Sequence, residues 1–261
     1  MENYQATHVF DVRGRTALIT GGTKGLGRAM AEGLIQNGCH VTLASRNTGG
    51  TEDLEELAAR HGCRCHLHAC DVTDTARVVD MVRAAEETMG RIDILINAAG
   101  MNRPKLLEDM DDATWDEILD LDLRACFIVT RETARVMRRQ KYGKIINISS
   151  MKSVLGVSDA GYTAYCAAKG AVNALTRQLA CELAADGITA NAIAPTFIKT
   201  AINARQLEDP TFYRSLTSRI PVGRIGEFRD LMGLLLLLAS DASQFITGQV
   251  FLLDGGIAAR Q

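Results

Sequence analysis

Tyr165 and Lys169 are the residues of this chain whose types and spacing are best suited to acid–base chemistry. They stand four positions apart in the segment YCAAK, and an α-helix would place both side chains on one face, within reach of each other. An isolated tyrosine has a pKa of about 10, so a pKa near 7 requires roughly 4 kcal/mol of preferential tyrosinate stabilisation. A close, partly desolvated lysine supplies much of that energy. The pattern therefore predicts a tyrosine that exchanges protons near neutral pH.

A glycine-rich segment near the N-terminus, TGGTKGLG, has the composition of a nucleotide-binding turn. Gly21 permits a tight turn, Gly25 lets the backbone approach a pyrophosphate, and Gly27 lets the following helix pack closely. The N-terminus of that helix would attract the phosphates. The segment lacks the GK[ST] ending of a P-loop, which argues against ATP hydrolysis. A plain surface turn is the alternative interpretation.

The end of the second predicted strand indicates which dinucleotide this turn would bind. An acidic residue usually stands there, ~20 residues into the motif, when the coenzyme is NAD, but this chain has Ser45 and Arg46. With no carboxylate to repel a 2′-phosphate, the Arg46 guanidinium, the Ser45 hydroxyl and Lys24 would hold that group. The sequence therefore predicts NADP(H) as the preferred coenzyme, with NAD(H) possible. Arg46 and Lys24 as ordinary solvated charges are the alternative.

Short apolar segments alternate with helical stretches along the chain. Strands are predicted at residues 16–20, 40–44, 65–69, 92–96, 144–148, 188–193 and 249–253, and a helix at 28–37, closed by Gly38. This alternation predicts an α/β fold: one Rossmann-like doubly wound domain over residues 1–261, with a seven-stranded, mainly parallel sheet and helices on both faces. The polar, partly helical residues 200–224 are predicted to form a substrate lid.

The composition limits the partners that this protein can have. The 261 residues are 47% hydrophobic and carry a net charge of -2, which argues against nucleic acid or an anionic membrane as the main partner. The N-terminal segment MENYQATHVFDVRGR is polar, and the apolar run at 231–239 is far shorter than the ~20 residues of a membrane span. We therefore expect a cytoplasmic protein in which that run is a buried helix. The seven cysteines, an odd number, favour reduced thiols.

The segment HGCRCHLHAC, residues 61–70, concentrates three cysteines and three histidines. As a strand it would place Cys63, Cys65 and Leu67 on one face and His66 and His68 on the other. The possible ligands could then not all converge on one tetrahedral zinc ion. We interpret the segment as an exposed edge strand and predict no metal; a metal site is the less favoured alternative.

Taken together, these segments resemble the short-chain dehydrogenase/reductase family from about Arg13 to Gly256. In family order, the matching motifs are TGGTKGLG, Asp71-Val72, Asn97-Ala98-Ala99-Gly100, Ile148-Ser149-Ser150, YCAAK, the loop with Pro195, Ile198 and Thr200, and Thr247-Gly248-Gln249 with Leu253-Asp254-Gly255-Gly256. Thr196 stands where the family more often has glycine. The resemblance implies a coenzyme site made of Gly21, Thr23, Lys24, Gly25, Leu26, Gly27, Ser45, Arg46, Asp71, Val72, Asn97, Ala98, Gly100, Tyr165, Lys169, Pro195, Ile198 and Thr200.

The resemblance also implies roles for the catalytic residues. Tyr165 would pass a proton to or from the substrate oxygen while hydride moves to or from the nicotinamide. Lys169 would lower the Tyr165 pKa and hold the nicotinamide ribose, and Ser150 would hydrogen-bond and orient the substrate oxygen. The spacing from Ser150 to Tyr165 is slightly longer than is usual in the family, so Ser149 and Ser153 are alternatives. Ser150 could instead only cap the end of a strand.

Asp122 departs from the family pattern, which has asparagine at this position. The asparagine is associated with a kinked helix whose backbone carbonyl holds a water near the lysine, and an aspartate could keep that backbone role. An ionised carboxylate ~8 Å from Tyr165 would oppose tyrosinate by about 2 kcal/mol at an effective dielectric constant of about 20. Our hypothesis is that Asp122 keeps the proton relay but raises the pH optimum of oxidation.

Basic residues near the expected cleft indicate the class of substrate. They are Arg103, Lys105, Lys152 and Lys199. Such groups suit an anionic or polyhydroxylated substrate, although each alone could be a solvated charge. Arg103 and Lys152 are the candidate substrate-binding residues, and the placement of Arg103 is similar to that in family members acting on sugar acids, such as gluconate and ketogluconate dehydrogenases.

The leading prediction is an NADP(H)-dependent oxidoreductase that interconverts a secondary alcohol and a ketone, on a sugar acid or another small polar substrate. One alternative is a 3-oxoacyl-thioester reductase of the same family. A catalytically poor NADP(H)-binding sensor or scaffold is another, raised by Asp122. The resemblance also implies a homotetramer, for which the apolar helix at 231–239 and the C-terminal strand offer self-complementary surface.

Overall fold

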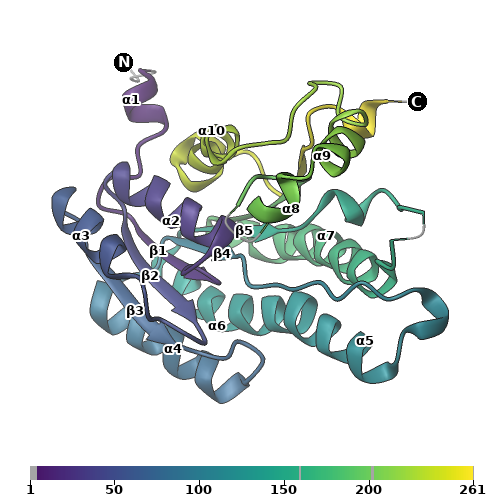
Figure 1. Ribbon diagram of the computed structural model, residues 1–261. Helices are drawn as coiled ribbons and strands as arrows, with labels where there is room; N and C mark the ends of the chain where they lie inside the picture. Colours follow the sequence, from purple (N-terminus) through teal and green to yellow (C-terminus); the bar gives the residue numbers. More distant parts are fainter. Residues whose placement is uncertain (1–4, 159, 201–202, 261) are drawn as a thin grey trace.

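The computed structural model describes residues 5–158, 160–200 and 203–260, and within them seven strands form one sheet (Figure 1). The strand order is β3-β2-β1-β4-β5-β6-β7, and every neighbouring pair is parallel. The strands are β1 (Thr16–Thr20), β2 (His40–Ser45), β3 (Cys65–Ala69), β4 (Ile94–Asn97), β5 (Gly143–Ile148), β6 (Ile188–Pro195) and β7 (Val250–Leu253). The predicted Rossmann-like α/β fold is confirmed, and the described sheet is wholly parallel.

Helices connect the strands and cover both faces of the sheet. The α-helices are α1 (Ala6–Val9), α2 (Gly25–Gln36), α3 (Glu52–Arg60), α4 (Thr75–Met89), α5 (Asp112–Leu119), α6 (Ala125–Gln140), α7 (Thr163–Leu183), α8 (Ala204–Leu207), α9 (Pro210–Thr217) and α10 (Phe228–Ala239). A π-helical turn, η2 (Asp120–Arg124), joins α5 to α6. The short 3-10 turns are η1 (Leu107–Asp109), η3 (Met151–Ser153), η4 (Ala184–Asp186), η5 (Asp241–Ser243) and η6 (Ile257–Ala259).

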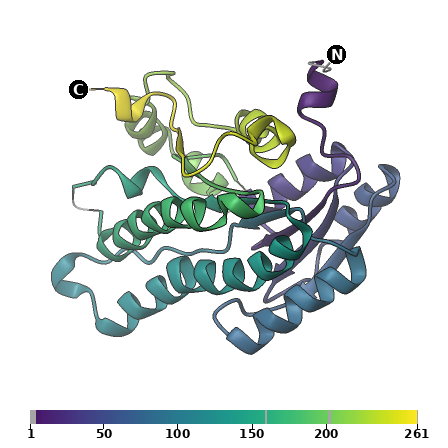
Figure 2. The same cartoon turned by 180° about the vertical axis from the view of Figure 1, so that it is seen from behind.

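The hydrophobic core has two large clusters, one on each face of the sheet, and a small third cluster formed by Ile118, Ala164 and Ala168. Helices α2, α3 and α10 pack on one cluster, and α4, α6 and α7 on the other, where they lie side by side in the view from behind (Figure 2). Side chains alternate along each strand, so Ala17 and Ile19 of β1 join the first cluster while Leu18 joins the second. Burial on both faces explains why these strands have nearly continuous apolar sequences.

Helix α2 begins at Gly25, three residues before the predicted start at residue 28. Gly25 and Gly27 therefore lie in the first turn of the helix rather than ahead of it. Gly21 has a φ of +66°, and a Cβ added to Gly27 would lie 2.3 Å from the carbonyl oxygen of Gly21. The glycines thus let the helix N-terminus approach the end of β1 closely.

Strand β4 begins at Ile94, two residues later than predicted. The preceding residue, Asp93, binds the start of β1 through its side chain. Its side chain is fully buried and accepts a hydrogen bond from the backbone N–H of Thr16 at 3.0 Å. Arg91 forms an ion pair with the same carboxylate. This residue fixes the start of β4 beside β1 instead of continuing the apolar strand.

The cysteine- and histidine-containing strand β3 lies at the edge of the sheet, as predicted. Cys63, Cys65 and Leu67 pack against one core cluster, while Cys70 belongs to the other. In the parts of the chain that the structure describes, no group of three or more His, Cys, Asp or Glu side chains is placed to hold a metal ion.

The segment predicted as a lid, residues 200–224, contains α8 and α9, and its residues 201 and 202 lie outside the described residues. The apolar run at 231–239 lies in α10, and Leu231, Leu235 and Leu238 are buried in the core, which confirms the predicted buried helix. No helix among the residues described is long and apolar enough to cross a membrane.

Replacing Gly27 with alanine should destabilise the first turn of α2. The added methyl group would meet backbone atoms rather than a flexible side chain, and such overpacking costs about 1–3 kcal/mol. Gly233→Ala in α10 is the matched control, since nothing lies within 4 Å of its added Cβ, and stability should stay level or rise. Urea unfolding measures both variants; equal stabilities would contradict the packing argument.

Candidate active site

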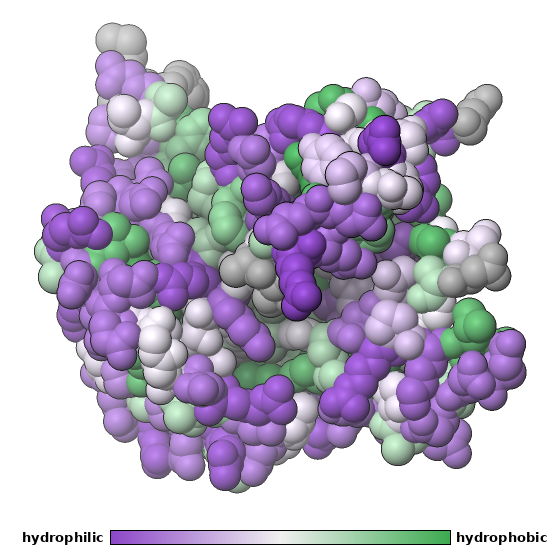
Figure 3. All heavy atoms as spheres, viewed as in Figure 1, coloured by the Kyte–Doolittle hydropathy of each residue, from purple (hydrophilic) through white to green (hydrophobic). Residues whose placement is uncertain are grey.

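A crevice of about 770 Å³ lies where the order of the strands reverses, between β1 and β4. Open α/β sheets bind ligands at the carboxyl ends of the strands at such a point. The space-filling view shows the molecule hollowed near its centre, with hydrophilic residues around the hollow (Figure 3). The predicted coenzyme residues that line the crevice are Gly21, Thr23, Lys24, Gly25, Leu26, Gly27, Ser45, Arg46, Asp71, Val72, Ala98, Gly100, Ile198 and Thr200.

Four predicted coenzyme residues do not line this crevice: Asn97, Pro195, Tyr165 and Lys169. Asn97 is buried, and its amide donates hydrogen bonds to Thr130 Oγ1 at 2.9 Å and Asn147 Oδ1 at 2.8 Å. Its side chain therefore ties β4 to β5 and α6. Pro195 is the last, buried residue of β6. The loops that follow these strands contribute to the crevice instead.

The end of the crevice beside the glycine turn has a positive character. Lys24 and Arg46 are exposed, line the crevice and form no ion pair with another described residue. Ser45, at the end of β2, is half-buried. Asp71 accepts hydrogen bonds from the backbone N–H and hydroxyl of Thr73 at 3.0 and 2.8 Å, and these bonds lower its pKa. The free N–H groups at the start of α2 add an anion-binding site.

Tyr165 and Lys169 lie on the same face of α7, as the spacing predicts. The Lys169 ammonium is 5.6 Å from the centre of the Tyr165 ring, and the tyrosine is half-buried. Lys169 Nζ also donates to the backbone oxygen of Ile148, at the end of β5, at 3.0 Å. Burial alone would lower the pKa of Lys169, but the Asp122 carboxylate, with a further contribution from Tyr165, raises it.

The side chain of Asp122 contacts Lys169 directly. Its Oδ2 lies 3.1 Å from Lys169 Nζ, and its Oδ1 accepts the backbone N–H of Met101 at 2.7 Å. From the sequence we expected only a backbone role for Asp122 and a charge at a distance from Tyr165. We did not expect this ion pair, because the two residues belong to η2 and α7, and nothing in the local sequence shows that these elements touch.

Gly100 connects the crevice to this ion pair. It lines the crevice, whose walls reach neither Ser150 nor Tyr165. A Cβ added to Gly100 would lie 3.1 Å from Asp122 Oδ1 and 3.3 Å from Lys169 Nζ. The ion pair therefore lies directly behind the glycine, and any larger residue would separate the crevice from the lysine.

Three serines follow β5, and their hydrogen bonds distinguish them. Ser149 is buried, and its hydroxyl donates to Asn173 Oδ1 at 2.7 Å. The Ser153 hydroxyl donates to the backbone oxygen of Ser150. Ser150 Oγ accepts the backbone N–H of Lys152 at 3.2 Å, which caps η3. Among the described residues, no acceptor takes the Ser150 hydroxyl proton, so this serine alone of the three can offer it to a substrate oxygen.

The four basic residues considered for substrate binding differ in their partners. Arg103 lines the crevice but pairs with Glu117 at 2.9 Å. Lys105 pairs with Asp111, and Lys199 is exposed. Lys152 is half-buried, with its ammonium 5.4 Å from the centre of the Tyr162 ring, and burial lowers its pKa. Of these residues, only Lys152 presents a partly desolvated charge near the start of α7.

Tyr162 and Asn203 are residues that the sequence analysis missed. The Tyr162 ring lies 6.3 Å from that of Tyr165, and their spacing of three residues at the start of a helix was the available signal. Asn203 lines the crevice and holds the loop after β6, because its side chain bonds the backbone of Ile198 and Thr200 at 2.8 Å. These contacts are local, three and five residues along the chain, but they belong to none of the motifs that the sequence analysis considered.

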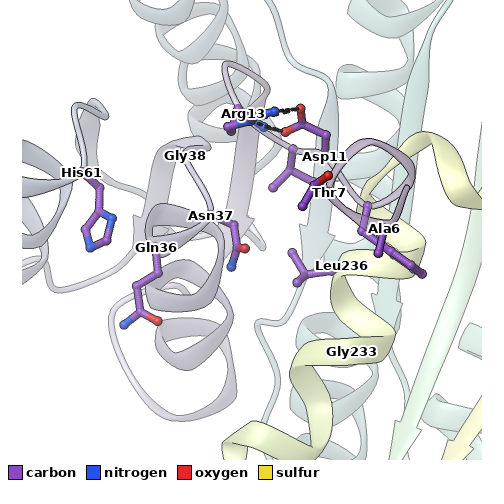
Figure 4. A pocket seen from close by; sticks show the side chains of 12 residues that line it. Ala6, Thr7, Asp11, Arg13, Gln36, Asn37, Gly38, His61, Gly233 and Leu236 are labelled. Atoms are coloured by element: carbon purple, nitrogen blue, oxygen red, sulfur yellow. Dashed lines mark hydrogen bonds and ion pairs between the residues drawn. The ribbon is translucent and has the colours of Figure 1, made fainter. Parts of the chain in front are cut away.

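A second hollow, of about 730 Å³, lies between α1, the end of α2 and α10 (Figure 4). The exposed ion pair between Asp11 and Arg13 borders it. None of the predicted catalytic or coenzyme residues lines this hollow. It therefore belongs to a different part of the surface from the candidate active site.

Comparison with known proteins agrees with this geometry. A family model described as enoyl-(acyl carrier protein) reductase matches residues 21–258. Gluconate 5-dehydrogenase of Gluconobacter oxydans is 37% identical over 249 residues, covering 95% of this chain and 96% of that protein. A 3-oxoacyl-(acyl-carrier-protein) reductase of Vibrio harveyi is 34% identical over 247 residues, covering 95% and 98%. A crystal structure of a gluconate 5-dehydrogenase from Burkholderia cenocepacia, in complex with NADP and tartrate, has a TM-score of 0.90 and 35% identity, covering 98% of this chain and all of that one.

The chain therefore belongs to the short-chain dehydrogenase/reductase family, as its motifs indicated. Members of this family are oxidoreductases that use NAD(P), and this chain is such an oxidoreductase, acting on alcohol groups of small molecules.

Alanine at Ser150 should lower activity, whereas alanine at Ser149 should lower stability. Ser150→Ala would remove the expected donor to a substrate oxygen, so kcat should fall by roughly 10²-fold while stability falls by about 1 kcal/mol. Ser149→Ala leaves the buried Asn173 Oδ1 without its donor and should cost about 1–3 kcal/mol of stability. Steady-state kinetics and thermal unfolding separate the two; a Ser150→Ala variant with full kcat would exclude the assigned role.

Proposed function

We propose that this protein is an NADP(H)-dependent oxidoreductase that interconverts a secondary alcohol and a ketone, with Tyr165 as the acid and base. The observation that carries this proposal is the arrangement at α7, where a buried ammonium lies 5.6 Å from the ring of a half-buried tyrosine. Beside them, the hydroxyl of Ser150 keeps its proton available. Such a donor pair suits a polarised carbonyl oxygen.

In the reducing direction, the proposed roles are as follows. Ser150 donates a hydrogen bond to the carbonyl oxygen and orients it, and the Tyr165 hydroxyl gives its proton to the same oxygen as the alcohol forms. In the oxidising direction, the tyrosinate takes that proton back. The coenzyme, when bound, supplies or accepts the hydride. Lys169 holds the ribose and governs the proton affinity of Tyr165.

The crevice suits a dinucleotide carrying a 2′-phosphate. The glycines leave room for a pyrophosphate, since an added Cβ at Gly27 would fill the turn. Lys24 and Arg46 offer two cations there that form no ion pair with another described residue. Ser45 and Arg46 occupy the end of β2, where an acidic residue would repel the phosphate, and the nearest carboxylate of the lining is Asp71, after β3. The NADP in the related Burkholderia structure supports the same preference. NAD(H) remains a weaker alternative.

For the substrate, we propose a sugar acid or a similar small polar anion. Lys152 carries a partly desolvated charge two residues after Ser150, and a carboxylate would pair with it. The gluconate 5-dehydrogenases among the relatives, one of them crystallised with tartrate, favour this class. The 3-oxoacyl-thioester reductase alternative is supported by the Vibrio relative. A catalytically poor coenzyme sensor is disfavoured by the intact Ser150, Tyr165 and Lys169.

The proposal also covers the domain organisation, the lid, the localisation and the oligomeric state. We treat residues 1–261 as one domain in which residues 200–224 act as a lid over the crevice, because Thr200 and Asn203 line it. A cytoplasmic homotetramer is the proposed form. In α10, Leu234, Leu236 and Leu237 are only partly buried, and Leu252 of the edge strand β7 is 40% exposed; both offer apolar surface to another copy.

Arg46→Ala should weaken the binding of NADP(H) by roughly ten- to a hundredfold and leave NAD(H) binding unchanged. The lost charge-assisted hydrogen bond is worth about 1.5–3 kcal/mol, and only the 2′-phosphate makes it. Arg60→Ala, at the exposed end of α3, is the control. Fluorescence titration with NADP(H) and with NAD(H) measures both affinities. Equal losses of affinity for the two coenzymes would show that Arg46 does not bind the 2′-phosphate.

Tyr165→Phe should reduce turnover by about 10²–10⁴-fold while NADP(H) binding persists, because only the transferable proton is lost. We would measure wild type and variant with 5-ketogluconate and with an acetoacetyl thioester. Tyrosine-dependent reduction of the keto acid supports the proposed substrate class, and preference for the thioester supports the alternative. Coenzyme binding with no turnover on either compound or on a broad carbonyl panel would leave the sensor hypothesis.

A further inference from the structure

The buried ion pair between Asp122 and Lys169 is placed to control the protonation of Tyr165. Both side chains are almost fully buried, with exposed fractions of 0% for Asp122 and 6% for Lys169. Water therefore screens their charges weakly. The ammonium lies beside the Tyr165 ring, so any change in its effective charge acts on the phenol.

An ammonium alone at this position would favour tyrosinate, but a carboxylate 3.1 Å from it largely cancels its field. Burial raises the pKa of Asp122, while the Lys169 ammonium and the Met101 N–H oppose that effect by stabilising the carboxylate. On α6, burial raises the pKa of Cys126 to about 12, so this thiol is neutral. Lys152, in η3, lies over the Tyr162 ring. The thiol of Cys166, on α7, lies near the Lys152 ammonium.

We propose that the Asp122 carboxylate offsets the charge of Lys169, so that Tyr165 remains a neutral phenol at neutral pH. The site is then set as a proton donor for carbonyl reduction, and the base form needed for alcohol oxidation is populated only in alkaline solution. Asp122 is a positioning residue in this scheme, since it acts through Lys169. The inference rests on the proposed function of Tyr165 and adds the direction in which the site works at neutral pH.

The two oxygens of Asp122 have separable roles, which makes the charge testable. Oδ1 accepts the Met101 N–H and fixes the loop after β4, a role that an amide oxygen fills equally well. Oδ2 faces only the ammonium among the described residues and supplies the charge. Asparagine at this position would remove the negative charge, and its amide oxygen could keep the Met101 N–H. Its NH₂ group would then face the ammonium, and Lys169 would retain the Ile148 oxygen as its acceptor.

The test is Asp122→Asn with Asp120→Asn as its matched control. Asp120 belongs to the same π-helical turn but is exposed and lies near Arg124. We expect the rising limb of the pH–rate profile for alcohol oxidation to move down by ~1 pH unit in Asp122→Asn. At a pH low on the wild-type limb, the variant should oxidise the alcohol about tenfold faster than wild type. Asp120→Asn should leave the profile in place. An unmoved profile in Asp122→Asn, or an equal shift in both variants, would overturn the proposal.

A second measurement needs neither the Asp122→Asn variant nor a substrate. The ultraviolet difference spectrum between wild type and Tyr165→Phe, titrated with NADP bound, reports the ionisation of this phenol directly. We expect the spectrum to show a protonated phenol at neutral pH and tyrosinate only in alkaline solution, as for an ordinary tyrosine. A midpoint near 7 would refute the offset by Asp122. Absence of any reductase activity would count against the proposed function but leave this titration valid.

Discussion

The burial of the Lys169 ammonium is the constraint on which the site depends. An ammonium withdrawn from water is costly unless charges and dipoles compensate it. Here the backbone oxygen of Ile148 and the carboxylate of Asp122 do so at 3.0 and 3.1 Å. The three partners come from β5, α7 and η2. Forming this one contact set therefore requires the strand end, the catalytic helix and the π-helical turn to assemble in a single arrangement.

The parallel sheet makes this assembly possible, because its strands all end at the same edge. The glycine turn after β1, the loop after β4 and the serines after β5 meet there. Met101 connects the parts, since its N–H binds Asp122 while the neighbouring Gly100 lines the crevice. The crevice and the ion pair between Asp122 and Lys169 therefore adjoin at Gly100 and Met101.

The residues that would choose the substrate lie outside this shared framework. The relatives include a gluconate dehydrogenase and an acyl-carrier-protein reductase at similar identity, so the framework itself does not separate these activities. Lys152 lies in η3 and Asn203 just before α8. Both residues are outside the sheet, where charge and loop shape vary without disturbing it. Substrate choice is in this view a property of the loops.

The sequence by itself determined the elements and the local pairs. Apolar periodicity predicted the seven strands, and helical spacing predicted that Tyr165 and Lys169 share a face, since both depend on neighbours in the chain. Only the tertiary structure decided which distant groups meet: Asp122 pairs with Lys169, Glu117 holds Arg103, and Asn97 turns its amide into the core. Such contacts join segments far apart in sequence, and their energies depend on burial, which no local pattern records.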